Sequence, residues 1–141
     1  MKANRVLLRK YRRLLLIHND NFRSKEILTG FERFAVESPV EAIAFNANRL
    51  KGIRKHDVYI TIEDSDLVSI IRAVRQKKWK LGEDVGILSY NETALKSVIS
   101  NGISTITTDF KLMGQQMAQM ILNREQKTIE NKFVMIDRKS F

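Results

Sequence analysis

Residues 57–93 hold the pattern that most constrains how this chain can fold. An apolar run at 58–62 ends in two carboxylates, Glu63 and Asp64, and a second apolar run at 85–88 ends in the polar residues 89–92. Between the two runs, apolar residues recur at helical spacing, namely Leu67, Ile70, Ile71 and Val74. A strand, a helix and a second strand form the unit from which parallel sheets are built. The segment therefore predicts a βαβ unit with polar side chains after each strand.

The same alternation continues through the rest of the chain. Further apolar runs predict strands at 14–17, 40–45, 103–106 and 133–136. Helical patterns predict helices at 4–11, from an N-cap at Ser24 to Pro39, at 93–100, and at 109–123 with Thr107 or Thr108 as its N-cap. Gly30 lies inside the second helix, where a glycine costs up to about 1 kcal/mol relative to alanine, so close packing is expected there. Six strands alternating with helices are typical of an α/β fold with a doubly wound, mostly parallel sheet.

The composition limits the classes of function. A length of 141 residues is enough for one domain with a core. With no cysteine, the chain has no disulfide and no thiolate metal ligand. No apolar run is long enough to span a bilayer and no signal peptide is visible, which predicts a cytoplasmic protein. The net charge of +9 attracts polyanions, but the cations are dispersed and match no nucleic-acid-binding motif. Solvated helix faces are the favoured interpretation of these charges.

The polar residues that follow the strands are the candidate ligand-binding groups. Ligands of open α/β sheets bind outside the carboxyl ends of the strands, which brings Glu63, Asp64 and Asn91 to one edge. Carboxylates accept hydrogen bonds and amides both donate and accept them, which suits sugar hydroxyls. His18 also follows a strand and could face a ligand, although a structural role is the simpler interpretation. The two carboxylates could instead form an acid/base pair, and Asp64 or Ser65 could cap the following helix.

Motifs for cofactor or metal chemistry are absent from the sequence. There is no phosphate-binding G-x-x-x-x-G-K-[ST], no dinucleotide-binding G-x-G-x-x-G and no G-x-S-x-G nucleophile elbow. The two histidines have no metal-ligand partner close in sequence. The sequence therefore predicts no cofactor, no metal and no catalytic residue.

Several segments resemble the lactose-repressor family of sugar-sensing transcription regulators. They read ITIEDSDL, LGEDVGILSYNET and GISTITTDFKLMGQQMAQMIL, and SKEILTGFERF matches a helix of the family's second lobe. The segments EDSDLV, GILSYNE and TDFKLMG are most similar in sequence to regulators with a GntR-type DNA-binding head. The family has the periplasmic-binding-protein-like (type I) fold, in which an effector binds between two lobes.

The resemblance implies a set of effector-binding residues. Glu63-Asp64, Tyr90-Asn91-Glu92 and Thr108 match family positions that contact the effector. The family's arginine in the first helix of the second lobe is replaced here by Ile27, and Arg23 is the candidate substitute. With His18, these residues complete the predicted ligand-binding set: Glu63, Asp64, Asn91, Thr108, Tyr90, Arg23 and His18.

The resemblance also implies how the chain is organised. Residues 1–141 are expected to form a single effector-binding lobe without a DNA-binding domain, so that DNA is contacted only through a domain absent here. Helix 109–123 belongs to the first lobe in the family. Its apolar face includes Phe110, Met113 and Met117 and would need another surface, either its own lobe or a second copy of the chain. The second copy is the favoured interpretation, which predicts a homodimer. The main hypothesis is the sugar-sensing part of a bacterial transcription regulator that is not an enzyme. The alternatives are a transport-type sugar-binding protein and a sugar-acting α/β enzyme.

Overall fold

The computed structural model describes residues 10–19 and 22–141, and of residues 22–24 only the backbone. The strands are β1 (Arg13–His18), β2 (Glu41–Asn46), β3 (Asp57–Thr61), β4 (Gly86–Tyr90), β5 (Ser104–Thr108) and β6 (Phe133–Ile136). The helices are α2 (Phe22–Glu37), α3 (Asp64–Gln76), α4 (Ala94–Val98) and α5 (Phe110–Leu122), with short 3-10 turns η1 (Ala47–Arg49) and η2 (Ile99–Asn101). The helix predicted at 4–11 lies almost wholly outside the described residues.

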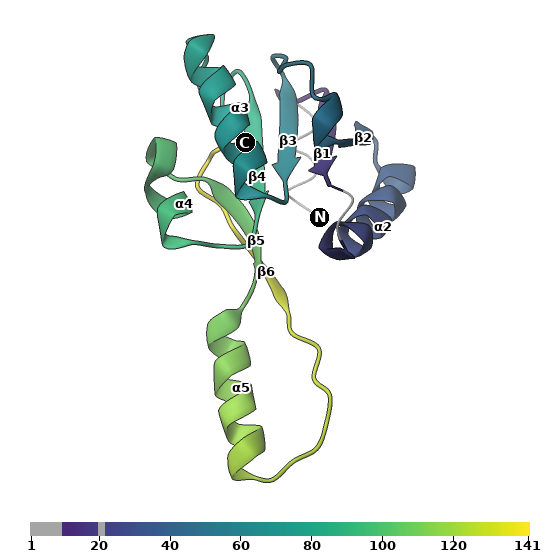
Figure 1. Ribbon diagram of the computed structural model, residues 1–141, viewed down its shortest axis with the longest axis vertical. Helices are drawn as coiled ribbons and strands as arrows, with labels where there is room; N and C mark the ends of the chain where they lie inside the picture. The colour runs from purple at the N-terminus through teal and green to yellow at the C-terminus, as the bar shows by residue number, and fades with distance from the viewer. Residues whose placement is uncertain (1–9, 20–21) are drawn as a thin grey trace.

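The strands form one sheet in the order β2-β1-β3-β4-β5-β6 (Figure 1). Every neighbouring pair is parallel except β5 and β6, which are antiparallel. The predicted α/β class with a mostly parallel sheet is confirmed. No helix in the described part of the chain is long and apolar enough to cross a membrane.

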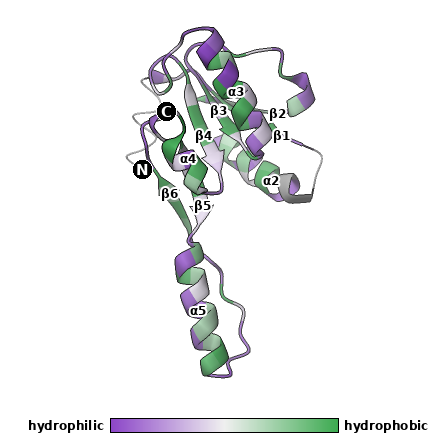
Figure 2. Cartoon of the chain, turned by 60° about the vertical axis from the view of Figure 1, so that its left-hand side comes forward, coloured by the Kyte–Doolittle hydropathy of each residue, from purple (hydrophilic) through white to green (hydrophobic). Residues whose placement is uncertain are grey.

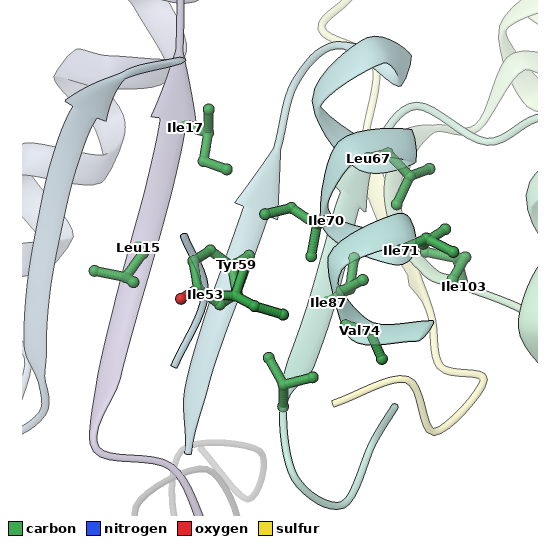
Figure 3. Packing of buried hydrophobic residues seen from close by; sticks show 11 residues of the cluster. Leu15, Ile17, Ile53, Tyr59, Leu67, Ile70, Ile71, Val74, Ile87 and Ile103 are labelled. Atoms are coloured by element: carbon green, nitrogen blue, oxygen red, sulfur yellow. The ribbon is translucent and has the colours of Figure 1, made fainter. Parts of the chain in front are cut away.

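The sheet buries both of its faces because successive strand residues point to opposite sides. In β1, Leu15 and Ile17 belong to the apolar cluster beneath α3, whereas Leu14 and Leu16 belong to the cluster beneath α2. The predicted stripe of α3 is buried as expected and faces the strands in Figure 3, which shows Leu67, Ile70, Ile71 and Val74. An apolar layer therefore covers each face of the central strands. Because both faces are buried, the sequences of these strands are apolar at nearly every position.

Helix α2 is less buried than its apolar pattern predicts. Phe31 is buried, but Phe34 is 38% exposed. The Phe34 ring packs beside the Phe31 ring, with 6.1 Å between the ring centroids. The expected close packing at Gly30 is wrong, because an added Cβ would find no atom within 4 Å. Ser24 is also not the N-cap, because α2 begins at Phe22. The helix lies over the edge strand β2 and its neighbour β1, so only a narrow stripe of its surface meets the sheet.

Helix α5 stands away from the body of the molecule (Figure 1). It begins directly after β5 and is capped by Asp109, whose side chain accepts a hydrogen bond from the backbone N–H of Leu112 at 2.9 Å. The predicted cap at Thr107 or Thr108 is therefore wrong by one or two residues. No residue of α5 is buried, and Figure 2 shows apolar residues along the projecting helix. A hollow of about 450 Å³ separates the helix from the returning segment and is lined by Met113, Met117 and Met120. The apolar stripe is thus covered only in part by its own chain.

The last residues of the chain fasten β4 and β5 together. The Ser140 hydroxyl donates to the carbonyl oxygen of Ile87 at 2.6 Å and accepts from the backbone N–H of Ser104 at 2.8 Å. The backbone N–H of Ile87 donates to the carbonyl of Ser140 at 2.8 Å. This tail passes so close to Gly82 that a Cβ added there would lie 2.1 Å from the carbonyl oxygen of Lys139.

Two glycine substitutions are predicted to change stability in opposite directions. Gly82→Ala should destabilise the protein by roughly 2–4 kcal/mol, because its φ of +82° disfavours a side chain and the tail would have to move. Gly30→Ala should stabilise it by about 0.5–1 kcal/mol, because Gly30 lies in open space within a helix. Urea unfolding followed by circular dichroism measures both changes. An unchanged midpoint for Gly82→Ala would contradict the tail packing described here.

Candidate functional site

The parallel strands β1, β3, β4 and β5 all end at the same edge of the sheet. Six of the seven predicted site residues lie at the last position of one of these strands or within three residues after it: His18, Glu63, Asp64, Tyr90, Asn91 and Thr108. The side chain of the seventh, Arg23, lies outside the described residues. The edge is held in register by the Thr61 hydroxyl, which donates to the Ser89 hydroxyl across β3 and β4 at 3.1 Å.

Lys96, on α4, joins the ends of β3 and β4. Its ammonium group forms an ion pair with Asp64 at 2.8 Å and donates to the carbonyl oxygens of Tyr90 at 2.8 Å and Asn91 at 2.9 Å. The residue is only 2% exposed. An ammonium group has three N–H donors, and here there are three acceptors. Lys96 therefore positions Asp64 and the β4–α4 turn, and it has no donor left for a ligand.

Sequence reasoning missed Lys96. Thr93 caps α4 by accepting a hydrogen bond from the backbone N–H of Lys96, so the lysine lies in the first turn of a short helix. From the sequence alone, a lysine at such a position is expected to be exposed to solvent, because lysines are almost never fully buried unless they are paired. The partners that bury it come from a different loop and from backbone carbonyls, which leave no mark in the sequence.

Asn91 presents an unoccupied polar side chain at this edge. Its backbone has a φ of 62°, a conformation that asparagine tolerates better than most residues. The backbone N–H donates to the carbonyl of Ile106 at 2.8 Å, which fixes the turn against β5. Within residues 10–19 and 22–141 the side-chain amide of Asn91 has no hydrogen-bond partner. The amide can therefore both donate to and accept from a ligand.

Tyr90 and Thr108 lie on the β6 side of the same edge. The Tyr90 ring lies beside that of Phe133, with 6.0 Å between centroids, and Phe133 pairs with Thr108 across β5 and β6. Burial raises the pKa of Tyr90, and the nearby charge of Glu26 raises it further. Its hydroxyl thus remains a neutral donor and acceptor at physiological pH. An apolar ring beside polar groups is an arrangement that suits the mixed surface of a sugar.

The carboxylates after β3 are arranged differently from the prediction. Glu63 is at the N-cap of α3, without a side-chain capping bond, so the expected cap at Asp64 or Ser65 is wrong. Asp66, which no motif in the sequence marks as a site residue, has a raised pKa, mainly from burial and also from the charge of Glu63. Its Oδ2 is buried and has no partner in the described part of the chain. The stretch EDSD thus supplies an additional acceptor in the first turn of α3.

Two other predicted groups lie apart from the Asp64–Lys96–Asn91 cluster. His18 lines a hollow of about 440 Å³ at the ends of β1 and β2, together with Asn46 and Arg49. Glu92 is not available to a ligand, because it accepts hydrogen bonds from Arg138 at 2.8 and 3.0 Å and from the Thr105 hydroxyl at 2.5 Å. The Arg138 hydrogen bonds hold the pKa of Glu92 below its usual value. Glu92 therefore anchors the C-terminal tail.

The arrangement provides hydrogen-bonding groups without an evident nucleophile. Carboxylates, an amide and hydroxyls lie at or just after the carboxyl ends of the parallel strands, and such groups can form hydrogen bonds with a polyol. In the part of the chain that the structure describes, no group of three His, Asp or Glu side chains could hold a metal ion.

Comparisons with known proteins place this geometry in a family. Residues 4–141 match the model of the periplasmic binding protein-like domain. A curated relative, the HTH-type transcriptional regulator GalR of Streptococcus thermophilus, is 30% identical over 99 residues, which cover 70% of this chain and 28% of the relative.

Solved structures share the fold at low sequence identity. A dimeric Lac repressor with an 11-residue C-terminal deletion has a TM-score of 0.71 and 17% identity, over 98% of this chain and 58% of that one. A complex of the transcriptional regulator CelR with cellobiose has a TM-score of 0.67 and 16% identity, over 99% of this chain and 50% of that one. The chain thus spans little more than a quarter of its curated relative and about half of these structures. The narrower resemblance to regulators with a GntR-type head is wrong, because the matches are to GalR-type and Lac-type regulators.

Replacing Lys96 by methionine tests whether it holds the two loops together. Lys96→Met keeps the apolar stem but leaves the carbonyls of Tyr90 and Asn91 without their donor, so we expect a loss of about 1–3 kcal/mol in unfolding free energy. Asp64 is largely exposed and regains water, so it adds little. Lys78→Met, at an exposed lysine, is the control and should stay within about 0.5 kcal/mol of the parent. Equal urea midpoints for the two variants would show that Lys96 does not have this role.

Proposed function

We propose that this chain, which belongs to the periplasmic binding protein-like domain family, is the effector-sensing part of a bacterial transcription regulator and binds a sugar or sugar derivative. The observation that carries the proposal is the placement of Asp64 and the Asn91 turn at one edge by the buried Lys96. The curated relative is itself described as a transcriptional regulator, and the CelR structure contains cellobiose. Such a regulator would act in the cytoplasm and without catalysis.

The polar groups at the carboxyl edge would supply one half of the effector site. We assign to this half Glu63, Asp64, Tyr90, Asn91 and Thr108, with Asp66 as an added acceptor and with Arg23 and His18 as candidates at its margin. The other half would come from a second lobe, to which α5 would also belong. Its projection from the carboxyl edge supports this, because a lobe placed there would cover both the polar groups and the apolar stripe.

Regulation would follow from closure of the two lobes on the effector. A ligand shifts an equilibrium only as far as it binds one state better than the other, so groups on both lobes must contact it. The chain crosses between the body and α5 at Asp109 and again at 123–132, and these crossings would act as the hinge. Closure would change the geometry of a homodimer and hence the affinity of a DNA-binding domain outside these 141 residues.

Sugar binding by the 141-residue chain is predicted to be weak and to depend on Asn91. Each hydrogen bond missing from the other half of the site is worth about 0.5–1.5 kcal/mol, so only millimolar-range binding is expected. Nuclear magnetic resonance titrations with a panel of mono- and disaccharides measure it. Asn91→Ala should abolish the shifts caused by any sugar that binds, whereas Asn123→Ala, at the far end of α5, should leave them unchanged. Tight binding by the chain alone, or shifts that survive Asn91→Ala, would contradict the proposed site.

The exposed face of α5 is predicted to hold two copies of the chain together. Phe110, Met117 and Ile121 are 53%, 58% and 71% exposed, and burying each is worth roughly 1.5–3 kcal/mol. Light scattering should report a dimer at high protein concentration. Met117→Lys should convert it to a monomer, because the charge would lie inside the new interface. Gln115→Lys, which adds the same charge on another side of the helix, is the control. A wild-type monomer, or equal effects of both substitutions, would reject this interface.

A further inference from the structure

A hollow on the β1–β2 end of the sheet gathers cations that the proposed sugar site does not use. It has a volume of about 280 Å³ and lies between the edge of the sheet and the segment 49–54, which connects η1 to β3. Its charged lining residues are Arg13, Arg49, Lys51 and Arg54, and the exposed part of its floor includes Ile43 and Phe45. Cations and apolar side chains thus line one hollow. At the proposed sugar site, by contrast, the cation Lys96 is buried and every one of its donors is occupied.

Arg13 lines this hollow and is held in place by a buried carboxylate. Its Nε and Nη2 donate to the two carboxylate oxygens of Asp57 at 2.9 and 2.5 Å, and Asp57 is 1% exposed. These hydrogen bonds raise the pKa of Arg13. The Tyr59 hydroxyl donates to Asp57 at 3.3 Å and accepts from the backbone N–H of Arg54 at 2.9 Å. One buried network therefore fixes both the guanidinium of Arg13 and the backbone of Arg54.

The guanidinium of Arg13 keeps donors for another acceptor. It has five N–H groups, and the pairing with Asp57 uses two of them. Because the side chain is 23% exposed, the remaining donors are accessible from the hollow. An arginine already oriented by a buried carboxylate loses little side-chain freedom when it binds an anion.

The other three cations differ from Arg13 in their pairing. Among the residues that the structure describes, Arg49, Lys51 and Arg54 form no ion pair. Two carboxylates act on Arg13, the buried Asp57 and Glu41 on the neighbouring strand. Four positive charges thus stand against two negative charges at the hollow. The remaining positive potential is concentrated over a concave surface, where it attracts anions most strongly.

We propose that this hollow binds a small organic phosphate monoester. Arginine forks match the geometry of phosphate oxygens and can bind them with two parallel hydrogen bonds. The apolar floor of Ile43 and Phe45 would receive the organic part of the molecule. The volume is just below the range of ligand pockets, which begins at about 300 Å³, so it suits a small molecule better than duplex DNA or a folded acidic protein. Arg49 also lines the hollow that contains His18, so the phosphate site adjoins the carboxyl edge of the sheet without sharing the Asp64–Lys96–Asn91 cluster.

Phenyl phosphate is a suitable probe because it combines a dianionic phosphate with a small apolar ring. We expect saturable shifts in nitrogen–proton spectra of the 141-residue chain at constant ionic strength, centred on Arg13, Gly52 and Arg54. Inorganic phosphate should bind the same residues more weakly, because it leaves the apolar floor empty, and phenol should not bind. No saturable shifts with phenyl phosphate, or equal shifts with phenol, would overturn the proposal.

Charge-matched variants separate a site from general attraction to a basic protein. Arg54→Gln and Arg49→Gln should each weaken phenyl phosphate binding by about tenfold, the effect expected when one charge-assisted hydrogen bond is lost. Lys111→Gln, on the exposed surface of α5, removes the same charge away from the hollow and should change binding less than twofold. Unchanged melting temperatures would show that the variants are folded, and the two arginine variants provide independent tests.

Competing ligands decide the class of anion. Equal weakening by Lys111→Gln would mean non-specific attraction and would overturn the site. A short DNA duplex or an acidic peptide that displaces phenyl phosphate at lower concentration, and loses this ability in Arg54→Gln, would show that the hollow serves a macromolecule and would overturn the small-molecule assignment. Retention of phenyl phosphate as the better ligand supports it.

Discussion

Parallel pairing of the central strands is the constraint on which both the fold and the site depend. A parallel pair cannot be joined by a tight turn, so each connection must run back over one face of the sheet, and here α2 and α3 run over opposite faces. All of the parallel strands therefore end on the same side of the sheet. The polar residues that follow them lie there together, although they are far apart in the sequence. The apolar runs make the strands stable only when both faces are covered. The same sequence feature thus fixes the core and the position of the candidate site.

The edge is polar, but its geometry depends on a buried charge. Burying an ammonium group is costly unless its donors are satisfied, and Lys96 meets this condition with one carboxylate and two backbone carbonyls. The carbonyls belong to a turn in which Asn91 has a positive φ, so the lysine also stabilises a backbone conformation that is otherwise uncommon. Asp64 gains an orientation from the same contact while most of its surface stays open to solvent. Packing and the arrangement of the candidate ligand-binding groups are therefore coupled through one side chain.

The sequence predicted the parts of the molecule that local periodicity determines. The buried stripe of α3 and the mostly parallel sheet follow from apolar spacing and from the alternation of strands with helices. Long-range contacts were not predictable in this way. The burial of Lys96 and the pairing of Glu92 with Arg138 depend on residues far apart in the chain or on backbone carbonyls. Phe34 shows the converse limit, because helical spacing identifies an apolar side but not how much of it the neighbouring layer covers.

The number of acceptors around each cation distinguishes the two regions of this chain that we assign to ligands. At Lys96 the donors and acceptors are equal in number, so a ligand at the carboxyl edge meets a neutralised lysine, the free amide of Asn91 and carboxylate oxygens. Such an edge favours a neutral molecule rich in hydroxyl groups and disfavours an anion. At Arg13 the acceptors are fewer than the donors, and the neighbouring Arg49 and Arg54 have none that form an ion pair in the described part of the chain. An anion there would complete an unfilled set of hydrogen bonds. The cations behind the net charge of +9 therefore have two roles. Lys96 is paired inside the protein and shapes the carboxyl edge, whereas the arginines at the hollow leave that surface able to attract negative charge.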